Sequence, residues 1–300
     1  MRKLFFILLF VSLLSNYSCD DGDIITVELE FEDTFYACEG VEDLVLYKTK
    51  EDPSESLSIL ISNYSLDDIL EVGADNTFYE EKSATLYYRT YNDASLPNDL
   101  FCSEIPPNVN IASNESSACT AVINTILVED DNDDVLAQLE DINENDDLED
   151  DDTDGDGLPN YIDADDDGDN ILTINENPDP NGDGDLSDAQ DTDGDNIPDY
   201  LDKDDDGDGV LTRNEENDSQ DKNPANDITD SDVGADYLNP TVNTSVPATA
   251  YREHTILKTY TVTVNITSIS LSFLSQDDLD FGILENRALS GSRKVTPDFN

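Results

Sequence analysis

The sequence predicts a mainly β protein, in which a β-sandwich-like domain is interrupted by a long, mostly irregular array of acidic loops. Two observations predict the β part. Apolar and polar residues alternate with a period of two on both sides of the acidic region, and clusters of Pro, Asn, Asp and Gly separate these stretches. The third observation predicts the array, because residues 152–176 return as residues 191–215, at an offset of 39 residues.

The chain begins with a predicted secretory signal, residues 1–18. Basic residues precede the apolar run Leu4–Leu14, which is too short to span a membrane. Cys19 follows where cleavage is expected and opens an acidic segment, residues 19–23. This arrangement resembles the lipidation site of Bacteroidetes-like envelope lipoproteins, although Asn16 stands where that family usually has Leu. The resemblance implies a lipidated Cys19 and a surface-exposed outer-membrane location; ordinary secretion is the alternative.

The β domain is predicted in two parts, residues 24–128 and residues 251–300. In the first part, Ile25, Val27, Leu29 and Phe31 alternate with polar residues; further strands are expected at Asp43–Lys48, Leu57–Ser62, Ala84–Tyr91 and Ala121–Val128. A short helix is expected at Asp133–Asn143, and later strands at Thr255–Ile266, Ser268–Leu274 and Asp280–Leu284. Two or three strands alone bury too little to be stable, so the second part is expected to complete the sheet of the first. The array (129–218) and a linker (219–250) would then be an insertion between strands.

Each half of the repeat contains two loops with one chemical pattern. Carboxylates occupy positions 1, 3 and 5, Gly or Asn position 6, an apolar residue position 7 and an acid position 12. Ca²⁺ prefers six to eight hard oxygen ligands, and position 6 needs a sharp turn that Gly and Asn accept. Asp204–Glu215 fits the EF-hand loop pattern at every ligand position. The array is therefore expected to bind several Ca²⁺ ions.

The predicted calcium ligands occupy positions 1, 3, 5 and 12 of the four loops, with three more in a less regular loop. They are Asp152, Asp154, Asp156, Asp163, Asp165, Asp167, Asp169, Glu176, Asp179, Asn181, Asp183, Asp191, Asp193, Asp195, Asp202, Asp204, Asp206, Asp208 and Glu215. Fainter copies begin near Glu129, Asp141 and Asp218. Residues between ligand positions receive no metal role, so Asp206→Ala is expected to cost more than Asp205→Ala.

The loops follow one another every 12 to 14 residues, which leaves no room for the flanking helices of an EF-hand. Residues 141–218 instead resemble thrombospondin type 3 repeats and related calcium-binding repeats of bacterial envelope proteins. Thrombospondin repeats carry cysteines that pair along the array, and this stretch has none, so its order should depend more on metal. A disordered acidic linker is the alternative, but glycines at one fixed loop position argue against it.

Three cysteines remain after Cys19. The expected compartment is oxidising, so a disulfide is plausible, and the odd number leaves one thiol free or paired elsewhere. The most local pairing, Cys102–Cys119, is favoured over pairings that involve Cys38.

Charge and motifs narrow the function. A net charge of −58 makes nucleic acid and anionic membrane surfaces poor partners and cations natural ones. No nucleophile elbow, phosphate loop or Cys/His pair occurs, so no enzyme is expected. The sequence predicts a lipid-anchored, calcium-binding surface protein that acts as an adhesion or assembly module or as a calcium-stiffened spacer. The alternative is a carbohydrate-binding or nutrient-capture lipoprotein with structural calcium, which an aromatic-lined concave face on the β domain would favour. The expected partners are calcium, the membrane through the lipid, and a glycan or protein ligand.

Overall fold

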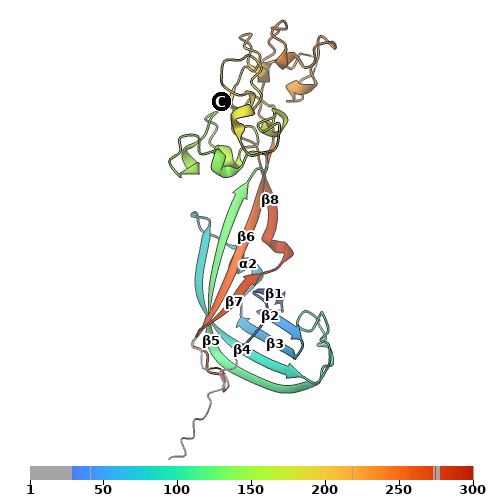
Figure 1. The fold of residues 1–300 in the computed structure, drawn as a ribbon, viewed down its shortest axis with the longest axis vertical. Helices are drawn as coiled ribbons and strands as arrows, with labels where there is room; N and C mark the ends of the chain where they lie inside the picture. The colour runs from blue at the N-terminus through green and yellow to red at the C-terminus, as the bar shows by residue number, and fades with distance from the viewer. Residues whose placement is uncertain (1–28, 41, 218, 273, 275–277, 300) are drawn as a thin grey trace, which may run out of the picture.

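The computed structural model describes residues 29–40, 42–217, 219–272, 274 and 278–299. The strand predicted from Ile25 lies mostly outside these residues, as does Cys19. The described chain is elongated, with a β barrel at one end and the acidic array at the other (Figure 1). The strands are β1 (Thr34–Glu39), β2 (Asp43–Glu51), β3 (Ser54–Ser62), β4 (Thr77–Tyr91), β5 (Ile111–Asp130), β6 (His254–Thr267), β7 (Asp278–Leu284) and β8 (Ser290–Val295), with one short helix, α2 (Leu66–Leu70).

Seven of these strands close into one barrel-like sheet. They are paired in the order of the chain, from β1 to β7, and β7 returns to β1. Neighbours are antiparallel except β1 and β7, which are parallel, and β8 pairs with the first part of β6. The prediction of a mainly β fold is confirmed. The predicted sandwich is replaced by a closed sheet, because β6 pairs with β5 along one edge and with β7 along the other.

The barrel is filled by side chains from alternate strand positions. On β2, Leu44 and Leu46 are fully buried while their neighbours are half-buried. The rings of Phe35 and Phe281 lie 5.2 Å apart between β1 and β7. The helix α2 adds Ile69 to the same core. Apolar residues at every second position therefore fill the interior, as expected for a barrel of this size.

Several elements differ from the sequence prediction. The strands β4 and β5 are longer than predicted, and β1, β8 and α2 were not predicted. The helix expected at Asp133–Asn143 is reduced to one 3-10 turn at Ala137–Leu139. No strand forms in the described part of 268–274, although Ile269 and Leu271 pack into the core. No helix among the described residues is long and apolar enough to cross a membrane.

The array leaves the barrel at the end of β5 and returns at the start of β6. These strands are direct neighbours, with Asp130 opposite Leu257, so residues 131–253 form an insertion whose two ends lie side by side (Figure 1). The array consists of turns and single-turn 3-10 helices, such as Asn160–Ile162 and Asp199–Leu201.

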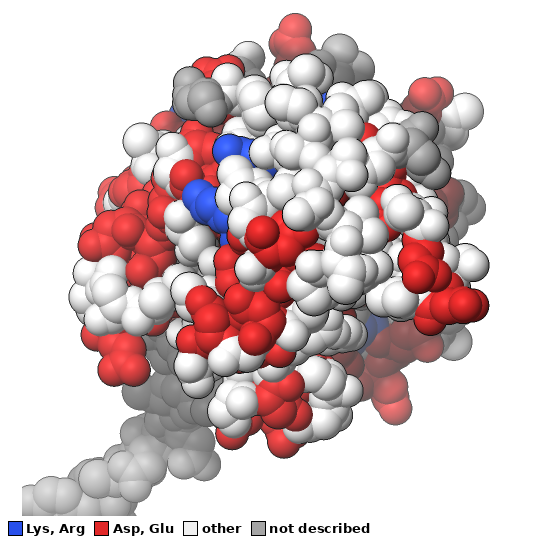
Figure 2. All heavy atoms as spheres, turned by 90° about the horizontal axis from the view of Figure 1, so that it is seen from above, with Lys and Arg blue, Asp and Glu red and all other residues white. Residues whose placement is uncertain are grey.

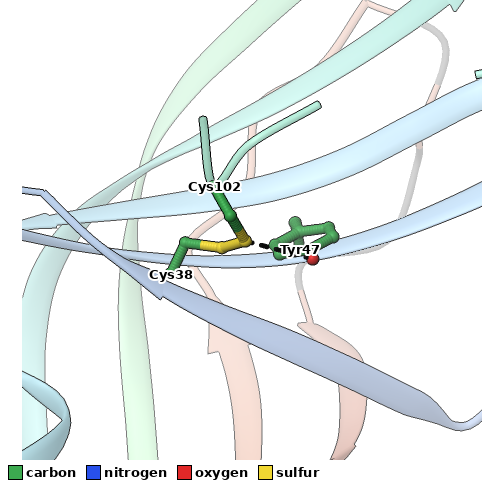
Figure 3. The surroundings of a disulfide bond; sticks show 3 residues. All are labelled: Cys38, Tyr47 and Cys102. Atoms are coloured by element: carbon green, nitrogen blue, oxygen red, sulfur yellow. Dashed lines mark hydrogen bonds between the residues drawn. A yellow bond between two sulfur atoms is a disulfide. The ribbon is translucent and has the colours of Figure 1, made fainter. Parts of the chain in front are cut away.

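The disulfide joins Cys38 to Cys102, so the predicted Cys102–Cys119 pair is wrong. The Cα atoms of Cys38 and Cys102 lie 5.2 Å apart, and the Tyr47 hydroxyl lies 3.4 Å from the Cys102 sulfur (Figure 3). Cys119 lies on β5 and is buried in the barrel core as a free thiol. Proximity in the sequence is misleading here. The loop after β4 carries Cys102 to Cys38 on β1, whereas the side chain of Cys119 on β5 points into the barrel.

Candidate metal sites of the acidic array

The regular loops are shaped by hydrogen bonds from their own carboxylates. The Asp152 carboxylate accepts the backbone N–H of Gly155 at 2.8 Å and that of Gly157 at 3.1 Å. In the last loop the Asp204 carboxylate likewise accepts the N–H of Gly209 at 3.0 Å. The residue at position 6 has a positive φ in all four loops: Gly157, Asn170, Asn196 and Gly209. These turns curl each loop so that positions 1, 3 and 5 converge.

Within each half of the repeat, the first loop packs tightly against the second. A Cβ on Gly168 would lie 2.1 Å from Oδ2 of Asp154, and a Cβ on Gly207 would lie 2.4 Å from Oδ2 of Asp193. No side chain fits at either glycine while the aspartate stays in place. The two halves therefore have the same internal packing.

Three loops bring their predicted ligands at positions 1, 3 and 5 together. In each group, one carboxylate oxygen per residue lies within 4.8 Å of the others; the groups are Asp152, Asp154 and Asp156; Asp191, Asp193 and Asp195; and Asp204, Asp206 and Asp208. The second group is exposed and the other two are partly buried. Glu215, at position 12 of the last loop, is 1 % exposed, and its two carboxylate oxygens have no hydrogen-bond partner.

A fourth group is buried and contains a residue that the loop pattern does not predict. Asp167, Asp169 and Glu176, at positions 3, 5 and 12 of one loop, gather with Asp205 from the other half of the repeat. All four are at most 2 % exposed. Both oxygens of Asp205 and one of each other carboxylate have no hydrogen-bond partner. None of the four takes part in an ion pair within the described chain. We call this the central cluster.

A fifth group repeats this arrangement beside the barrel. Asp131, Asp133 and Glu140 gather with Asp166, again within 4.8 Å. The first three occupy positions 3, 5 and 12 of the faint loop that begins at Glu129. We call this the junction cluster, because Asp131 directly follows β5.

Asp166 and Asp205 reach these clusters by the same local geometry. The backbone N–H of Asp166 donates to the Thr173 hydroxyl at 3.2 Å, and that of Asp205 donates to the Thr212 hydroxyl at 3.3 Å. Both threonines are fully buried. Each aspartate is thus held at the backbone, and its carboxylate faces an earlier loop. Asp205, which the loop pattern leaves without a ligand position, therefore lies in a group that could hold a metal ion. The only sequence signal is that the Asp and Thr both recur at the 39-residue offset.

Among the residues that the structure describes, no basic side chain forms an ion pair with the central or the junction cluster. Burial first, and then neighbouring carboxylates, raise the pKa of Asp131 to about 10 and those of Glu140 and Asp205 to about 9. The same causes raise the pKa of Asp167 well above its usual range. The end of the molecule that carries the array also shows many acidic side chains and few basic ones (Figure 2). Without a cation, much of this charge must be removed by protonation.

The remaining predicted ligands do not gather into groups among the described residues. Asp163 pairs with His254, with Oδ1 and Nδ1 2.7 Å apart. The carboxylates of Asp165 and Asp179 accept backbone N–H groups of their own loops, and that of Asp202 accepts the N–H of Asp204 in the next loop. The irregular loop with Asn181 and Asp183 is exposed. These residues shape loops or join segments, and a direct metal role for them has no geometric support.

Residues 219–250 fold onto the array and do not form the predicted linker. The Thr229 N–H donates to Asp236 Oδ1 at 2.6 Å, as the Thr192 N–H donates to Asp199 Oδ1 at 2.7 Å. Asp236 is fully buried. This segment is a third, degenerate copy of the first loop, and Ile228 replaces the acid at position 1, which conceals it in the sequence.

No family model, no curated protein and no solved structure matches the chain.

Proposed function

We propose that this chain is a calcium-binding cell-envelope protein whose array folds around several Ca²⁺ ions and serves as a platform for adhesion or assembly. The central cluster carries the proposal. Four buried carboxylates with unpartnered oxygens are costly, because removing one charge from water costs several kcal/mol unless a partner compensates it. A bound divalent cation supplies that compensation.

The chemistry of the donors favours calcium over other metals. The clusters offer carboxylate oxygens, and neither histidine nor cysteine belongs to any cluster of the described residues. Hard oxygen donors suit Ca²⁺, Mg²⁺ and Mn²⁺, while zinc and copper prefer nitrogen and sulfur. Mg²⁺ usually keeps several waters, whereas Ca²⁺ accepts many protein oxygens in flexible geometry. Four carboxylates on curled loops therefore fit Ca²⁺ best.

The insertion between β5 and β6 supports a platform over a spacer. The two ends of the array lie at adjacent strands, so stiffening the array does not lengthen the path between two domains. It changes only the shape of one protruding surface. Anchoring through Cys19 would present that surface from the envelope; Cys19 lies outside the described residues, and this part of the proposal rests on the sequence.

A second candidate function is carbohydrate binding by the barrel, with structural calcium. A groove of about 320 Å³ on the barrel is lined by Tyr36, Tyr47, Leu96 and Pro97, among other residues. The rings of Tyr36 and Tyr47 lie 5.8 Å apart, and Phe101 stacks on Tyr47 at 4.6 Å. Adjacent aromatic faces with flanking polar groups suit the faces and hydroxyls of a sugar. A glycan array probed with the full chain and a Tyr47→Ala variant tests this.

Calcium binding is tested by titration calorimetry of the full chain after chelation. We expect several ions to bind, with dissociation constants of about 10⁻⁴–10⁻³ M or tighter, and the chain to become more compact. Asp169→Asn should remove one ion, while the matched change Asp183→Asn, in the exposed irregular loop, should remove none. Absence of heat and of compaction at millimolar Ca²⁺ refutes the proposal.

A further inference from the structure

We propose that the junction cluster is a divalent-cation site that clamps the array onto the rim of the barrel. This inference rests on the proposed function, because that proposal supplies the cation. It goes beyond the proposed function by giving one site a role in joining the array to the barrel. The other clusters lie within the array and order its loops. The junction cluster joins the first residues after β5 to the body of the array.

The geometry of the junction cluster is that of a built site. Asp131, Asp133, Glu140 and Asp166 are 8 %, 2 %, 4 % and 2 % exposed. Five of their oxygens are buried without a hydrogen-bond partner: Oδ2 of Asp131, Oδ2 of Asp133, Oε1 of Glu140 and both oxygens of Asp166. Unpartnered buried oxygens that converge within 4.8 Å are the ligand set a cation needs.

No protein cation fills this role in the described chain. His254 lines the same pocket as Asp131 and Asp133, but it is paired with Asp163. Two further basic side chains are held by Glu129, at position 1 of the same loop. Arg293 contacts both Glu129 oxygens at 2.9 Å, and Lys258 lies 3.4 Å from one of them. Glu129 therefore fixes β5 to β6 and β8, and the acids further along the loop are left without a counter-charge.

The clamp complements direct contacts on the other side of the junction. At the start of β6, His254 pairs with Asp163, and the Arg252 N–H donates to Asn170 Oδ1 at 3.1 Å. These contacts hold the returning strand. On the outgoing side, after β5, the junction cluster is the corresponding connection. With a cation bound, both ends of the insertion are held against the array, and chelation frees only the β5 side.

Two buried tyrosines provide local reporters. Tyr200 is 7 % exposed, and burial first, and then the charges of Asp166, Asp133 and Glu140, raise its pKa to about 12, so its hydroxyl lies within electrostatic range of the junction cluster. Tyr237 has the same relation to the central cluster. The chain has no Trp, so tyrosine is the sensitiser for bound Tb³⁺, a luminescent ion that takes Ca²⁺ sites.

The experiment compares Asp166→Asn with its matched control Asp205→Asn, 39 residues away, in the full chain. Amide hydrogen exchange at 131–140 is measured with Ca²⁺ and with chelator, and Tb³⁺ emission is measured with and without Tyr200→Phe. In the wild type, Ca²⁺ should slow exchange at 131–140 at least about tenfold, and Tyr200→Phe should reduce emission. Asp166→Asn should abolish both effects and remove one ion. Asp205→Asn should also remove one ion and preserve both effects.

Each other outcome is decisive. If the wild type binds calcium but Asp166→Asn keeps the exchange protection and the Tyr200-dependent emission, the clamp is refuted while calcium binding stands. Loss of protection in Asp205→Asn as well refutes a separate junction site. If the wild type binds no ion, the proposed function itself fails. Glu140→Gln removes one ligand without touching the repeat, and it replaces Asp166→Asn if that variant does not fold.

Discussion

Asp205→Asn should destabilise the array in calcium and stabilise it in chelator. The amide has nearly the shape of the carboxylate and carries no charge. In calcium the change removes one of four ligands of the central cluster. In chelator it removes a buried carboxylate that has no partner and must bind a proton at neutral pH. A purely structural role for Asp205 does not predict opposite signs under the two conditions.

Both magnitudes follow from simple linkage. At ~10 mM Ca²⁺, a site with a dissociation constant of ~10⁻⁴ M stabilises the fold by about 2.7 kcal/mol. Losing an outer partner weakens a metal site by about 10–100-fold, so losing a ligand should weaken it by about 100-fold. The stabilisation then falls to about 0.4 kcal/mol, a loss of about 2.3 kcal/mol. In chelator at pH 7, an aspartate with a folded pKa of about 9 costs at most about 4 kcal/mol relative to an unfolded pKa of about 3.9. The variant avoids this cost.

The assay is urea unfolding of the full chain, followed by circular dichroism and by proteolysis of the array, with calcium or with chelator. Asp206→Asn, at the neighbouring position, is the control; it is less buried, so its stabilisation in chelator should be smaller. If Asp205→Asn is less stable than the wild type under both conditions, or unchanged under both, the reasoning is refuted.

Four further predictions concern pH, cysteine chemistry, anchoring and topology. The raised pKa of Glu140 means that its contribution to metal-free stability is complete below about pH 4 and is lost as the pH rises through about 9; calcium affinity should rise over the same range, as pH-dependent calorimetry with proton release will show. Cys119 is buried, and burial raises its thiol pKa to about 11, so iodoacetamide should modify it only after unfolding; labelling of the native chain would contradict this. Cys19→Ala should release the protein from the membrane fraction and abolish fatty-acid labelling, and labelled lipid on the variant would refute the anchor. Replacing 131–248 by a Gly/Ser linker should leave a barrel that melts cooperatively, whereas a chain ending at Val128 lacks the ring-closing strands and should not; a cooperatively melting Val128 chain would contradict the ring.

The local parts of this structure are visible in the sequence, and the long-range parts are not. Ile25, Val27, Leu29 and Phe31 alternate with polar residues, and the predicted strand Asp43–Lys48 lies within β2, so local sequence is enough to place a strand there. Positions 1, 3 and 5 of a loop converge within one turn, so their grouping follows from spacing. Asp205 contacts residues at least 29 positions earlier, and this depends on how the loops stack. The Cys38–Cys102 bond spans 64 residues and follows from the path of the loop after β4.

The closure of the sheet could not be predicted either, because it depends on pairing between strands that are far apart in the sequence. The β1–β7 seam joins Thr34 to Ile283 and Phe35 to Leu284, and no local pattern encodes such a register. Strand β1 escaped prediction because its exposed Tyr36 interrupts the alternation of apolar and polar residues. The third copy of the first loop escaped because Ile228 occupies the place of an acid.

The side-by-side attachment of the array has a mechanical consequence. A pull on anything bound to the array reaches the barrel through β5 and β6 together, in the same direction. Because these strands are neighbours, the pull does not slide one along the other. It is resisted by the ladders to β4 and β7, and the β4–β5 ladder runs over nearly all of β4. A force parallel to two paired strands loads all the hydrogen bonds between them together, whereas a force that peels the strands apart breaks these bonds one at a time. Tension applied at the array is therefore borne by the longest hairpin of the barrel.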